Sequence, residues 1–236
     1  MKVSIVIPAL NEEKNIASVI RATLAQDYPS FEVIVVDNGS VDKTIDIASQ
    51  FPIKVVSELR KGTNYAREKG RQVATGDVIA NLDADCLPPP HWLSIGVAHM
   101  KNKNVSAVSG PYDYYDGGWL FRTLSLATQK NIYSSTNKIT NSLNSGGAII
   151  GGNVIIRASV FKKAGGYNTA IVFYGDDTDT AQRVSKYGKI IFDRNFIVKS
   201  SARRFKNEGI FKVTFLYVFY FFYVTFLSVF RRNKNN

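Results

Sequence analysis

The chain has 236 residues, a single cysteine and a formal net charge of +11. This length supplies enough apolar residues for one large α/β domain or two small ones, and one cysteine cannot form an internal disulfide, which excludes the disulfide-rich secreted class. The positive charge indicates an anionic partner: a nucleic acid, a phosphate-bearing substrate or a membrane surface.

The first part of the chain alternates short apolar runs with helical patterns. The opening run is too short, and too quickly followed by proline and acids, to be a signal peptide, so we expect a cytoplasmic catalytic part. The runs that predict strands lie at residues 3–8, 31–37, 53–57 and 76–83. Helical patterns follow them, with Asn11 and Ser40 as expected N-caps of the first two helices. This alternation predicts a parallel doubly wound α/β sheet, whose ligands bind beyond the carboxyl ends of its strands.

The second half is less regular. VSAVSGPYDYY predicts one strand, LNSGGAIIGGNVIIR a glycine-rich loop leading into another, GDDTDTAQRVSKYG a capped helix, and KIIFDR a further strand. Internal repeats and low-complexity linkers are absent from the sequence. We therefore expect one domain over residues 1–205 and an appendage over residues 206–236.

Two carboxylates, Asp83 and Asp85, follow the fourth predicted strand. If the chain turns after Leu82, both carboxylates can bind one hard cation, and Mg²⁺ or Mn²⁺ prefers such oxygen ligands together with substrate phosphates. Lys61 and Arg67, on the preceding segment, can supply positive charge to a phosphate. The alternative is a solvated acidic loop with no ligand.

Several motifs occur together, in order: VSIVIPALNEEKNI, FEVIVVDNGSVDKT, GTNYAREKGRQVATGDVIANLDADCLPPPHWL, GGNVIIRASVFKKAGGYN and GDDTDTAQRVSKYGKIIFD. In this order and spacing they resemble family 2 glycosyltransferases. The resemblance covers residues 3 to about 205 and implies the GT-A fold, a Rossmann-like doubly wound mixed sheet. It also implies that Asp83 and Asp85 are the DxD metal motif, with Mg²⁺ or Mn²⁺ bridging the diphosphate of a nucleotide-sugar.

The resemblance also implies a donor site. Together with Lys61, the expected donor-nucleotide residues are Pro8, Ala9, Asn11, Glu12, Asp37, Asn38, Gly39, Ser40, Arg67, Asp83 and Ala84. Arg203 and Arg204, in a basic motif that resembles the end of many such domains, are expected at the diphosphate, although lipid phosphate is a competing use.

Sugar transfer needs a carboxylate near the acceptor hydroxyl, and Asp176, Asp177 and Asp179 are the candidates. Acids at a helix N-terminus are also ordinary partners of the helix dipole. In the resembled family the second acid of this motif is the general base, so we name Asp177, with Asp176 as the fallback. The resemblance implies an inverting mechanism.

A glycine-rich loop and a tryptophan are the candidate acceptor or sugar residues. By resemblance, Gly151, Gly152 and Asn153 lie near the donor sugar and the acceptor. Trp92 is the fourth candidate. Plain turn chemistry accounts for some of the glycines, and a tryptophan more often packs in a core than binds a sugar.

The tail contains an uncharged run, Val213 to Phe230, that is rich in Phe and Tyr. Basic residues lie on both sides of it: Arg203, Arg204, Lys206, Arg231, Arg232 and Lys234. Such flanks favour anionic lipid over nucleic acid, and we expect an apolar amphiphilic helix on the cytoplasmic leaflet, with Tyr217, Tyr220 and Tyr223 at the interface. A single membrane span, or a helix buried against the domain or in a dimer, is the alternative.

The sequence thus predicts an inverting glycosyltransferase that uses a UDP-, GDP- or dTDP-sugar and a lipid-linked or polysaccharide acceptor, at the cytoplasmic face of the membrane, and that binds no nucleic acid. A sugar nucleotidyltransferase and an inactive membrane-binding scaffold are the rival hypotheses. The former usually has a glycine-rich loop with a basic residue after its first strand, where this chain has PALNEEKN.

Overall fold

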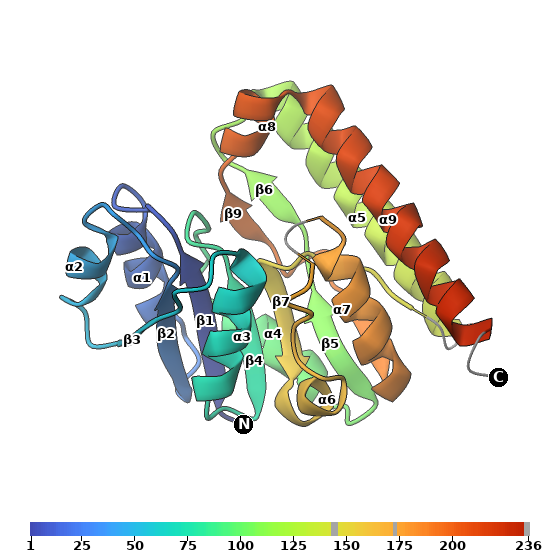
Figure 1. Cartoon of the computed structure of the whole chain (residues 1–236), viewed down its shortest axis with the longest axis horizontal. Coiled ribbons are helices and arrows are strands. Elements are labelled where there is room, and N and C mark those ends of the chain that lie inside the picture. Colours follow the sequence, from blue (N-terminus) through green and yellow to red (C-terminus); the bar gives the residue numbers. More distant parts are fainter. Residues whose placement is uncertain (143–145, 172–173, 234–236) are drawn as a thin grey trace.

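The structure, a computed structural model, describes residues 1–142, 146–171 and 174–233. Its centre is a seven-stranded sheet with the order β3-β2-β1-β4-β7-β5-β8 (Figure 1). The strands are β1 (Val3–Ala9), β2 (Phe31–Asp37), β3 (Lys54–Ser57), β4 (Val78–Leu82), β5 (Val105–Ser109), β7 (Asn153–Arg157) and β8 (Lys189–Phe192). β7 runs antiparallel to β4 and β5, and the other neighbouring pairs are parallel. The predicted mixed α/β sheet is therefore confirmed.

Helices cover both faces of this sheet. α1 (Ile16–Leu24) and α4 (Trp92–Met100) pack on one face, and α3 (Thr63–Val73), α6 (Ala158–Lys163) and α7 (Asp176–Val184) on the other. Residues alternate between the two faces along each strand, so β1 sends Ile5 into the first core and Val6 into the second. Each apolar strand therefore supplies residues to both cores.

The two predicted helix caps have a different role. α1 begins at Ile16 and α2 (Thr44–Ala48) at Thr44, so neither Asn11 nor Ser40 is a cap. Asn11 has a left-handed backbone (φ 55°), its amide donates to Ser40 Oγ (2.9 Å), and its side-chain oxygen accepts from the Val41 amide (2.9 Å). The loops that follow β1 and β2 are therefore joined at the carboxyl edge of the sheet.

A long excursion leaves the sheet between β5 and β7. It contains β6 (Tyr112–Tyr114), which pairs with β9 (Val198–Ser200) in a second, two-stranded sheet, and the long helix α5 (Trp119–Ser142). The sequence predicted one strand where β5 and β6 stand, and it did not predict α5.

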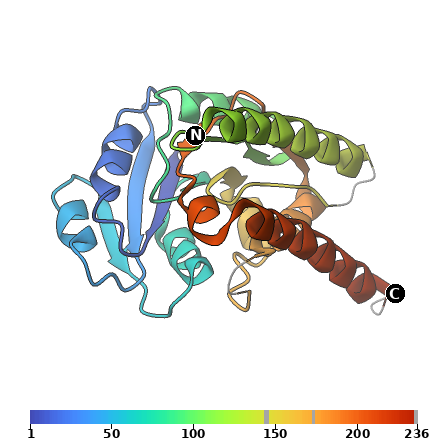
Figure 2. The ribbon, with the colours of Figure 1, turned by 90° about the horizontal axis from the view of Figure 1, so that it is seen from above.

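The chain ends in α8 (Arg203–Glu208) and α9 (Ile210–Asn233). The predicted domain boundary at residue 205 falls inside α8. α5 and α9 overlap in Figure 1, but the view from above separates them as two arms that extend from the domain (Figure 2).

α9 has two different faces. Its inner face, defined by Val213, Tyr217 and Tyr220, packs toward the domain: Val213 is fully buried and both tyrosines contact Tyr174. Tyr217 nevertheless keeps 43% of its surface exposed and Tyr223 49%, so the expectation that Tyr217, Tyr220 and Tyr223 lie at a membrane interface stays a prediction. The outer face, defined by Phe211, Phe215 and Val218, is exposed by 92%, 66% and 51%.

A search of the described residues finds no helix with both the length and the apolar character that a membrane crossing requires. Lys234, one of the basic residues that flank the apolar run, lies outside the described residues. The described part of the chain likewise does not extend to the side chains of Arg231 and Arg232.

Candidate active site

The carboxylate of Asp83 stands directly after β4, at the carboxyl edge of the sheet. Its Oδ1 accepts a hydrogen bond from Arg67 Nη2 (2.9 Å), and its Oδ2 accepts one from the Tyr112 hydroxyl (2.9 Å). Tyr112 belongs to β6, and the sequence gave no sign of this contact, because only the fold brings the excursion back over β4. Asp83 is therefore fixed from two sides.

Arg67 connects this carboxylate to the predicted base. Its Nη1 donates to Asp176 Oδ2 (3.0 Å) and lies 3.9 Å from Asp177 Oδ1. Only 7% of the Arg67 side chain is exposed. The guanidinium thus lies between Asp83 and Asp176 and offsets part of their charge, since like charges held this closely need a cation between them. Its predicted role at the nucleotide stays a prediction.

Two glycines let the backbone approach these acids closely. A Cβ on Gly151 would lie 2.1 Å from Asp177 Oδ1, and a Cβ on Gly152 would lie 2.0 Å from Asp83 Oδ2. The Gly151 amide donates to Asp177 Oδ2 (2.9 Å). The turn before β7 is thus shaped around both carboxylates, which explains its glycines by close approach rather than by turn chemistry alone.

Asp177 lies in the first turn of α7. Burial, together with the neighbouring charge of Asp176, raises the pKa of Asp177 to about 7, against the favourable effects of Arg67 and the Gly151 amide. Its side chain nevertheless keeps 34% of its surface exposed, so a substrate hydroxyl can reach it. A reachable carboxylate with a pKa near neutrality has the properties of a general base.

Asp179, the third candidate acid, pairs with Arg183 at 2.8 Å within the same helix. This i,i+4 ion pair gives it an ordinary structural role.

Asp85 is the second of the two carboxylates that the sequence predicts as metal ligands. Burial and the charges of Asp83 and Glu12 raise the pKa of Asp85 to about 7, and Arg203 lies 3.6 Å away. Arg203 itself pairs with Glu12 at 2.5 Å. Partly buried carboxylates whose mutual repulsion is incompletely compensated form a donor set that fits a hard divalent cation. In the described residues, no group of three or more His, Cys, Asp and Glu side chains could hold a metal by itself.

Asp37 and Asn38, two predicted donor residues at the end of β2, differ in what their side chains bind. Asp37, 3% exposed, accepts hydrogen bonds from the Gly39 amide (3.0 Å) and the Ser40 amide (3.2 Å). Asn38 is used internally: its amide group donates to the carbonyls of Glu58 and Arg60. We therefore correct the role of Asn38 to holding the loop that follows β3.

The remaining donor candidates lie at the same edge of the sheet. Pro8 and Ala9 end β1, Ala84 is buried between the two aspartates, and Lys61 is exposed in the loop before α3.

Trp92 and Asn153 belong to the core. Both are fully buried, Trp92 Nε1 donates to Asn153 Oδ1 (2.9 Å), and the indole stacks on Phe196 at 5.3 Å. Asn153 Nδ2 also donates to the Phe196 carbonyl (2.8 Å). Their predicted role at the acceptor or sugar is therefore wrong, because neither side chain has surface for a substrate to touch.

The two adjacent arginines of the basic motif point to different places. Arg203 lies with Glu12 and Asp85, as a diphosphate role requires. The guanidinium of Arg204 instead lies 4.8 Å from the Tyr174 ring and pairs with Glu208.

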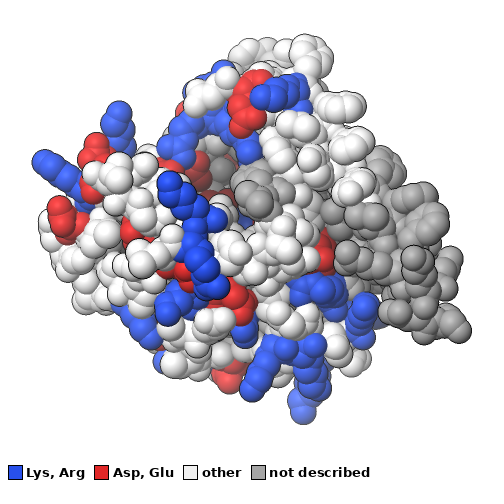
Figure 3. Space-filling model, viewed as in Figure 1, with Lys and Arg blue, Asp and Glu red and all other residues white. Residues whose placement is uncertain are grey.

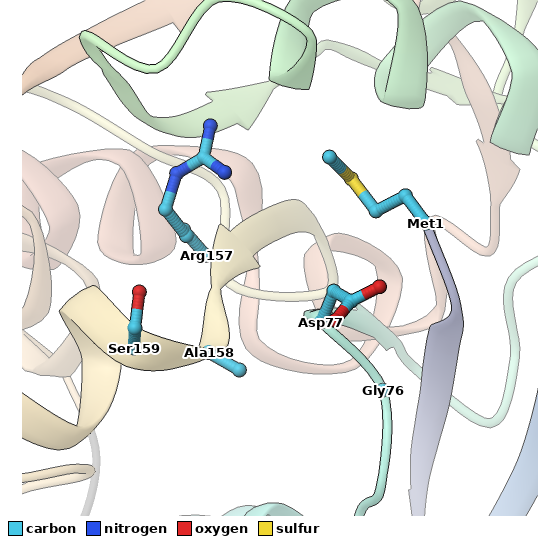
Figure 4. Close-up of a pocket in the computed structure, with 6 residues that line it drawn as sticks. All are labelled: Met1, Gly76, Asp77, Arg157, Ala158 and Ser159. Atoms are coloured by element: carbon cyan, nitrogen blue, oxygen red, sulfur yellow. The ribbon is translucent and has the colours of Figure 1, made fainter.

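The space-filling view shows carboxylate atoms in a hollow below α8, with basic side chains at its rim (Figure 3). A different hollow, of about 460 Å³, lies at the opposite edge of the sheet, where Met1, Asp77 and Arg157 line it (Figure 4). It is remote from the acids, and the guanidinium of Arg157 is bound to backbone carbonyls such as that of Met100.

The sequence model of Glycosyl transferase family 2 matches residues 4–165. The chain belongs to the family 2 glycosyltransferases. It is therefore a glycosyltransferase, which decides against the sugar nucleotidyltransferase. The match ends before Asp176 and Asp177, so it does not test the base assignment, which stays a prediction.

Individual relatives of this family 2 glycosyltransferase are also glycosyltransferases. Glycosyltransferase AglE of Haloferax volcanii is 29% identical over 215 residues, which cover 86% of this chain and 68% of AglE. The dolichol-phosphate mannosyltransferase of Pyrococcus furiosus is 33% identical over 118 residues, 48% of this chain and 34% of that protein. The chain also spans 38% and 59% of two further relatives, so it corresponds to part of these longer proteins.

Solved structures confirm the GT-A fold. Mannosyltransferase PcManGT from Pyrobaculum calidifontis, in complex with GDP-Man and Mn²⁺, superimposes with a TM-score of 0.68 at 23% identity, covering 85% of this chain and 56% of that one. Glucosyl-3-phosphoglycerate synthase from Mycobacterium tuberculosis, with Mn²⁺, UDP and phosphoglyceric acid, gives 0.61 at 24% identity, with 88% and 73% covered.

Proposed function

We propose that this family 2 glycosyltransferase is metal-dependent and inverting, and that it transfers a sugar from a nucleoside diphosphate donor to a hydroxyl of a lipid-linked or polysaccharide acceptor. The observation that carries the proposal is the guanidinium of Arg67, which contacts Asp83 on one side and Asp176 and Asp177 on the other. This guanidinium brings together in one site a carboxylate suited to the leaving diphosphate and a carboxylate suited to the acceptor.

Asp177 is the proposed base. Its pKa of about 7 lets it ionise near neutral pH and still accept a proton from an alcohol as the new bond forms. The hydrogen bond from the Gly151 amide engages Oδ2 and thereby orients the carboxylate. Attack by the activated hydroxyl on the anomeric carbon, from the face opposite the leaving group, inverts that carbon and needs no covalent enzyme intermediate.

Asp85 and Asp83 are the proposed metal ligands, and Mg²⁺ or Mn²⁺ would supply positive charge to the departing diphosphate. Asp85 is the more available of the two, because both oxygens of Asp83 already accept hydrogen bonds from protein groups. Arg203, poised between Glu12 and Asp85, would add charge to the same phosphates. The Mn²⁺ in two structures of similar fold supports this choice.

The proposed nucleoside site lies over the joined loops after β1 and β2. An ionised carboxylate has about four acceptor positions, so Asp37 can still receive a hydrogen bond from a base or ribose after binding two backbone amides. Nucleotides bound in related folds include GDP-Man and UDP, and we keep UDP-, GDP- and dTDP-sugars as the donor class.

The proposed acceptor is membrane-linked. The outer face of α9 exposes Phe211, Phe215 and Val218, and Lys212 beside them is 64% exposed, a combination that suits the surface of an anionic membrane. A related Escherichia coli enzyme is a glucosyltransferase that acts on a diphosphoundecaprenol-linked sugar. We propose peripheral association with the cytoplasmic leaflet, where nucleotide-sugars are found.

A donor panel tests this function. Purified protein is incubated with UDP-, GDP- and dTDP-sugars, with Mg²⁺, with Mn²⁺ and without metal, and release of nucleoside diphosphate and thermal shift are measured. The expected result is stabilisation by one nucleotide class that requires the metal. If no donor binds in the presence of either metal, the proposal is wrong. Sedimentation with anionic vesicles, comparing the native chain with Phe211→Ser/Phe215→Ser, tests the membrane part separately.

A further inference from the structure

The inner face of α9 contacts the segment that leads into the proposed base. The ring of Tyr174 lies 5.5 Å from that of Tyr217 in an edge contact and 5.4 Å from that of Tyr220 in a stacked contact. Gly175 follows Tyr174, and α7 then begins at Asp176. The tail helix therefore contacts the chain two residues before the acid that Arg67 binds.

Arg204 completes this contact from α8. Its guanidinium carbon lies 4.8 Å from the centre of the Tyr174 ring and 5.9 Å from that of Tyr217, and its Nη1 donates to the Tyr217 hydroxyl at 3.4 Å. A guanidinium over an aromatic face is attracted by the ring quadrupole. Both tail helices thus contribute to holding Tyr174.

The backbone at Tyr174 needs such support. Its φ is 39°, in the left-handed region that non-glycine residues rarely adopt, and Gly175 follows with φ 86°. Conformations of this kind persist only where the surroundings hold them. These two residues lead directly into α7, so the contacts around Tyr174 act on the backbone that precedes Asp176 and Asp177.

The inner face of α9 also contacts α7 itself, so the tail helix touches both the segment before the proposed base and the helix that carries it. The outer face of α9 has the same i, i+4, i+7 spacing, yet Phe211, Phe215 and Val218 face outward. One helix therefore presents two chemically different faces to two different surroundings.

We propose that Tyr217 and Tyr220 are positioning residues, whose contacts with Tyr174 hold the first turn of α7 in the geometry that presents Asp177 to the acceptor. The inference rests on the proposed role of Asp177 as the base. It makes α9 part of the catalytic unit rather than an appendage. It also separates this task from the outer face, which is left for a lipid surface.

The test compares two variants of the full chain: Tyr217→Ala/Tyr220→Ala on the inner face of α9, and Thr214→Ala at an exposed position of the same helix. The readouts are kcat, the Kd of the donor, and hydrogen exchange of the amides of residues 174–184. We expect the inner-face variant to lose at least about 10-fold in kcat, to keep its donor Kd within about twofold, and to exchange faster. Thr214→Ala should change none of the three, and Tyr217→Phe/Tyr220→Phe, which keeps both rings, should restore exchange and kcat.

Normal kcat and normal exchange in the inner-face variant would overturn the inference. If that variant does not fold, Arg204→Gln, which removes the guanidinium but leaves the rings, decides by the same readouts: native values overturn the inference, and faster exchange with reduced kcat supports it. If the native chain transfers no sugar, the proposed function fails. The exchange comparison still shows whether the inner face holds α7.

Discussion

Arg67 Nη2 donates a 2.9 Å hydrogen bond to Asp83 Oδ1, so the middle of α3 is fixed to the residue that directly follows β4. The opposite side of the same guanidinium reaches Asp176 at the start of α7. Three elements that are distant in sequence thus meet at one buried charge. The spacing between the leaving-group side of the site and the base side therefore depends on this side chain.

Arg67→Lys tests that dependence. A lysine keeps the charge but has a single nitrogen, which cannot contact Asp83 and Asp176 in the same planar geometry. We expect kcat/KM to fall about 100-fold, with a lower melting temperature, because a buried carboxylate loses its partner. Steady-state kinetics and thermal unfolding measure both effects.

The matched control is Arg71→Lys, one helical turn further along α3. Arg71 pairs with Glu68 at 2.6 Å, away from the acids, and this change should leave kcat/KM within about twofold. Equal losses in the two variants would contradict a specific role for Arg67.

Asp177→Asn removes the proposed base with little change in shape. Since a positioned base contributes roughly 10²–10⁴-fold, we expect transfer to fall by at least about 100-fold while the donor still binds. Asp179→Asn, in the same turn but paired with Arg183, serves as the control and should keep most of the activity. Stopped-time transfer assays and donor titration separate the two effects; native turnover in Asp177→Asn would refute the assignment.

The pH dependence should follow Asp177. Because its carboxyl must be ionised to accept a proton, kcat/KM should rise as pH increases from 5 and level off above about 7, the pKa given by burial and Asp176. A pH–rate profile that stays flat from pH 5 to 8 would count against a base with this pKa.

The same shift affects stability. The pKa of Asp177 is raised in the folded state, so that state binds the proton more tightly than the unfolded chain, and stability falls as pH rises from about 4 to about 7. Asp177→Asn should therefore stabilise the protein at pH 8 and have little effect at pH 4. With 34% of the side chain exposed, the gain should be only about 1 kcal/mol, and denaturant unfolding at both pH values measures it.

Asp85→Asn should weaken metal-assisted donor binding. The change removes the carboxylate with the more available oxygens, and we expect the Mn²⁺ concentration for half-maximal activity to rise about 10-fold or more. Calorimetric titration of metal in the presence of nucleoside diphosphate measures this directly. Asp193→Asn, whose carboxylate instead pairs with His99 at 2.7 Å, is the control; unchanged metal affinity in Asp85→Asn would remove Asp85 from the site.

Gly152→Ala should damage the site by crowding. Its Cβ would lie 2.0 Å from Asp83 Oδ2, so the carboxylate or the turn must move, at a cost of about 1–3 kcal/mol in the free energy of unfolding. Gly118→Ala, where a Cβ meets nothing within 4 Å, is the control and should be neutral. Thermal melts and kcat/KM decide: a Gly152→Ala protein with native stability and activity would show that the turn adapts freely.

The strands and most helices of the first half could be predicted because local pattern and tertiary environment agree there. α5 could not. Its sequence is rich in Ser, Thr and Asn, which are weak helix formers, and it shows no continuous apolar stripe. Tertiary contacts stabilise it: buried Asn137 binds both the carbonyl (2.9 Å) and the amide (2.6 Å) of Ala148. A sequence pattern cannot reveal a helix held by such distant polar contacts.

The sequence motifs indicated which residues are candidates for the site, but they could not show the direction in which each side chain points. The acids at Asp83, Asp85 and Asp177 came from their placement and from the family resemblance. Whether a neighbouring side chain faces the site or the core depends on packing, and for this reason Trp92 and Asn153 proved to be core residues and Arg67 a buried cation.

The direction of β7 has a consequence for the evolution of this enzyme. Because β7 runs antiparallel to β5, the chain leaves the sheet at Ser109 and returns at Asn153 on the same edge, beside the acids. An excursion whose ends are neighbours can change in length or composition without shifting the register of any strand of the seven-stranded sheet, since loop closure costs little per added residue. In principle, a different segment can replace this excursion. A new acceptor preference can then arise there while the first half of the chain, with the proposed nucleotide site, stays unchanged.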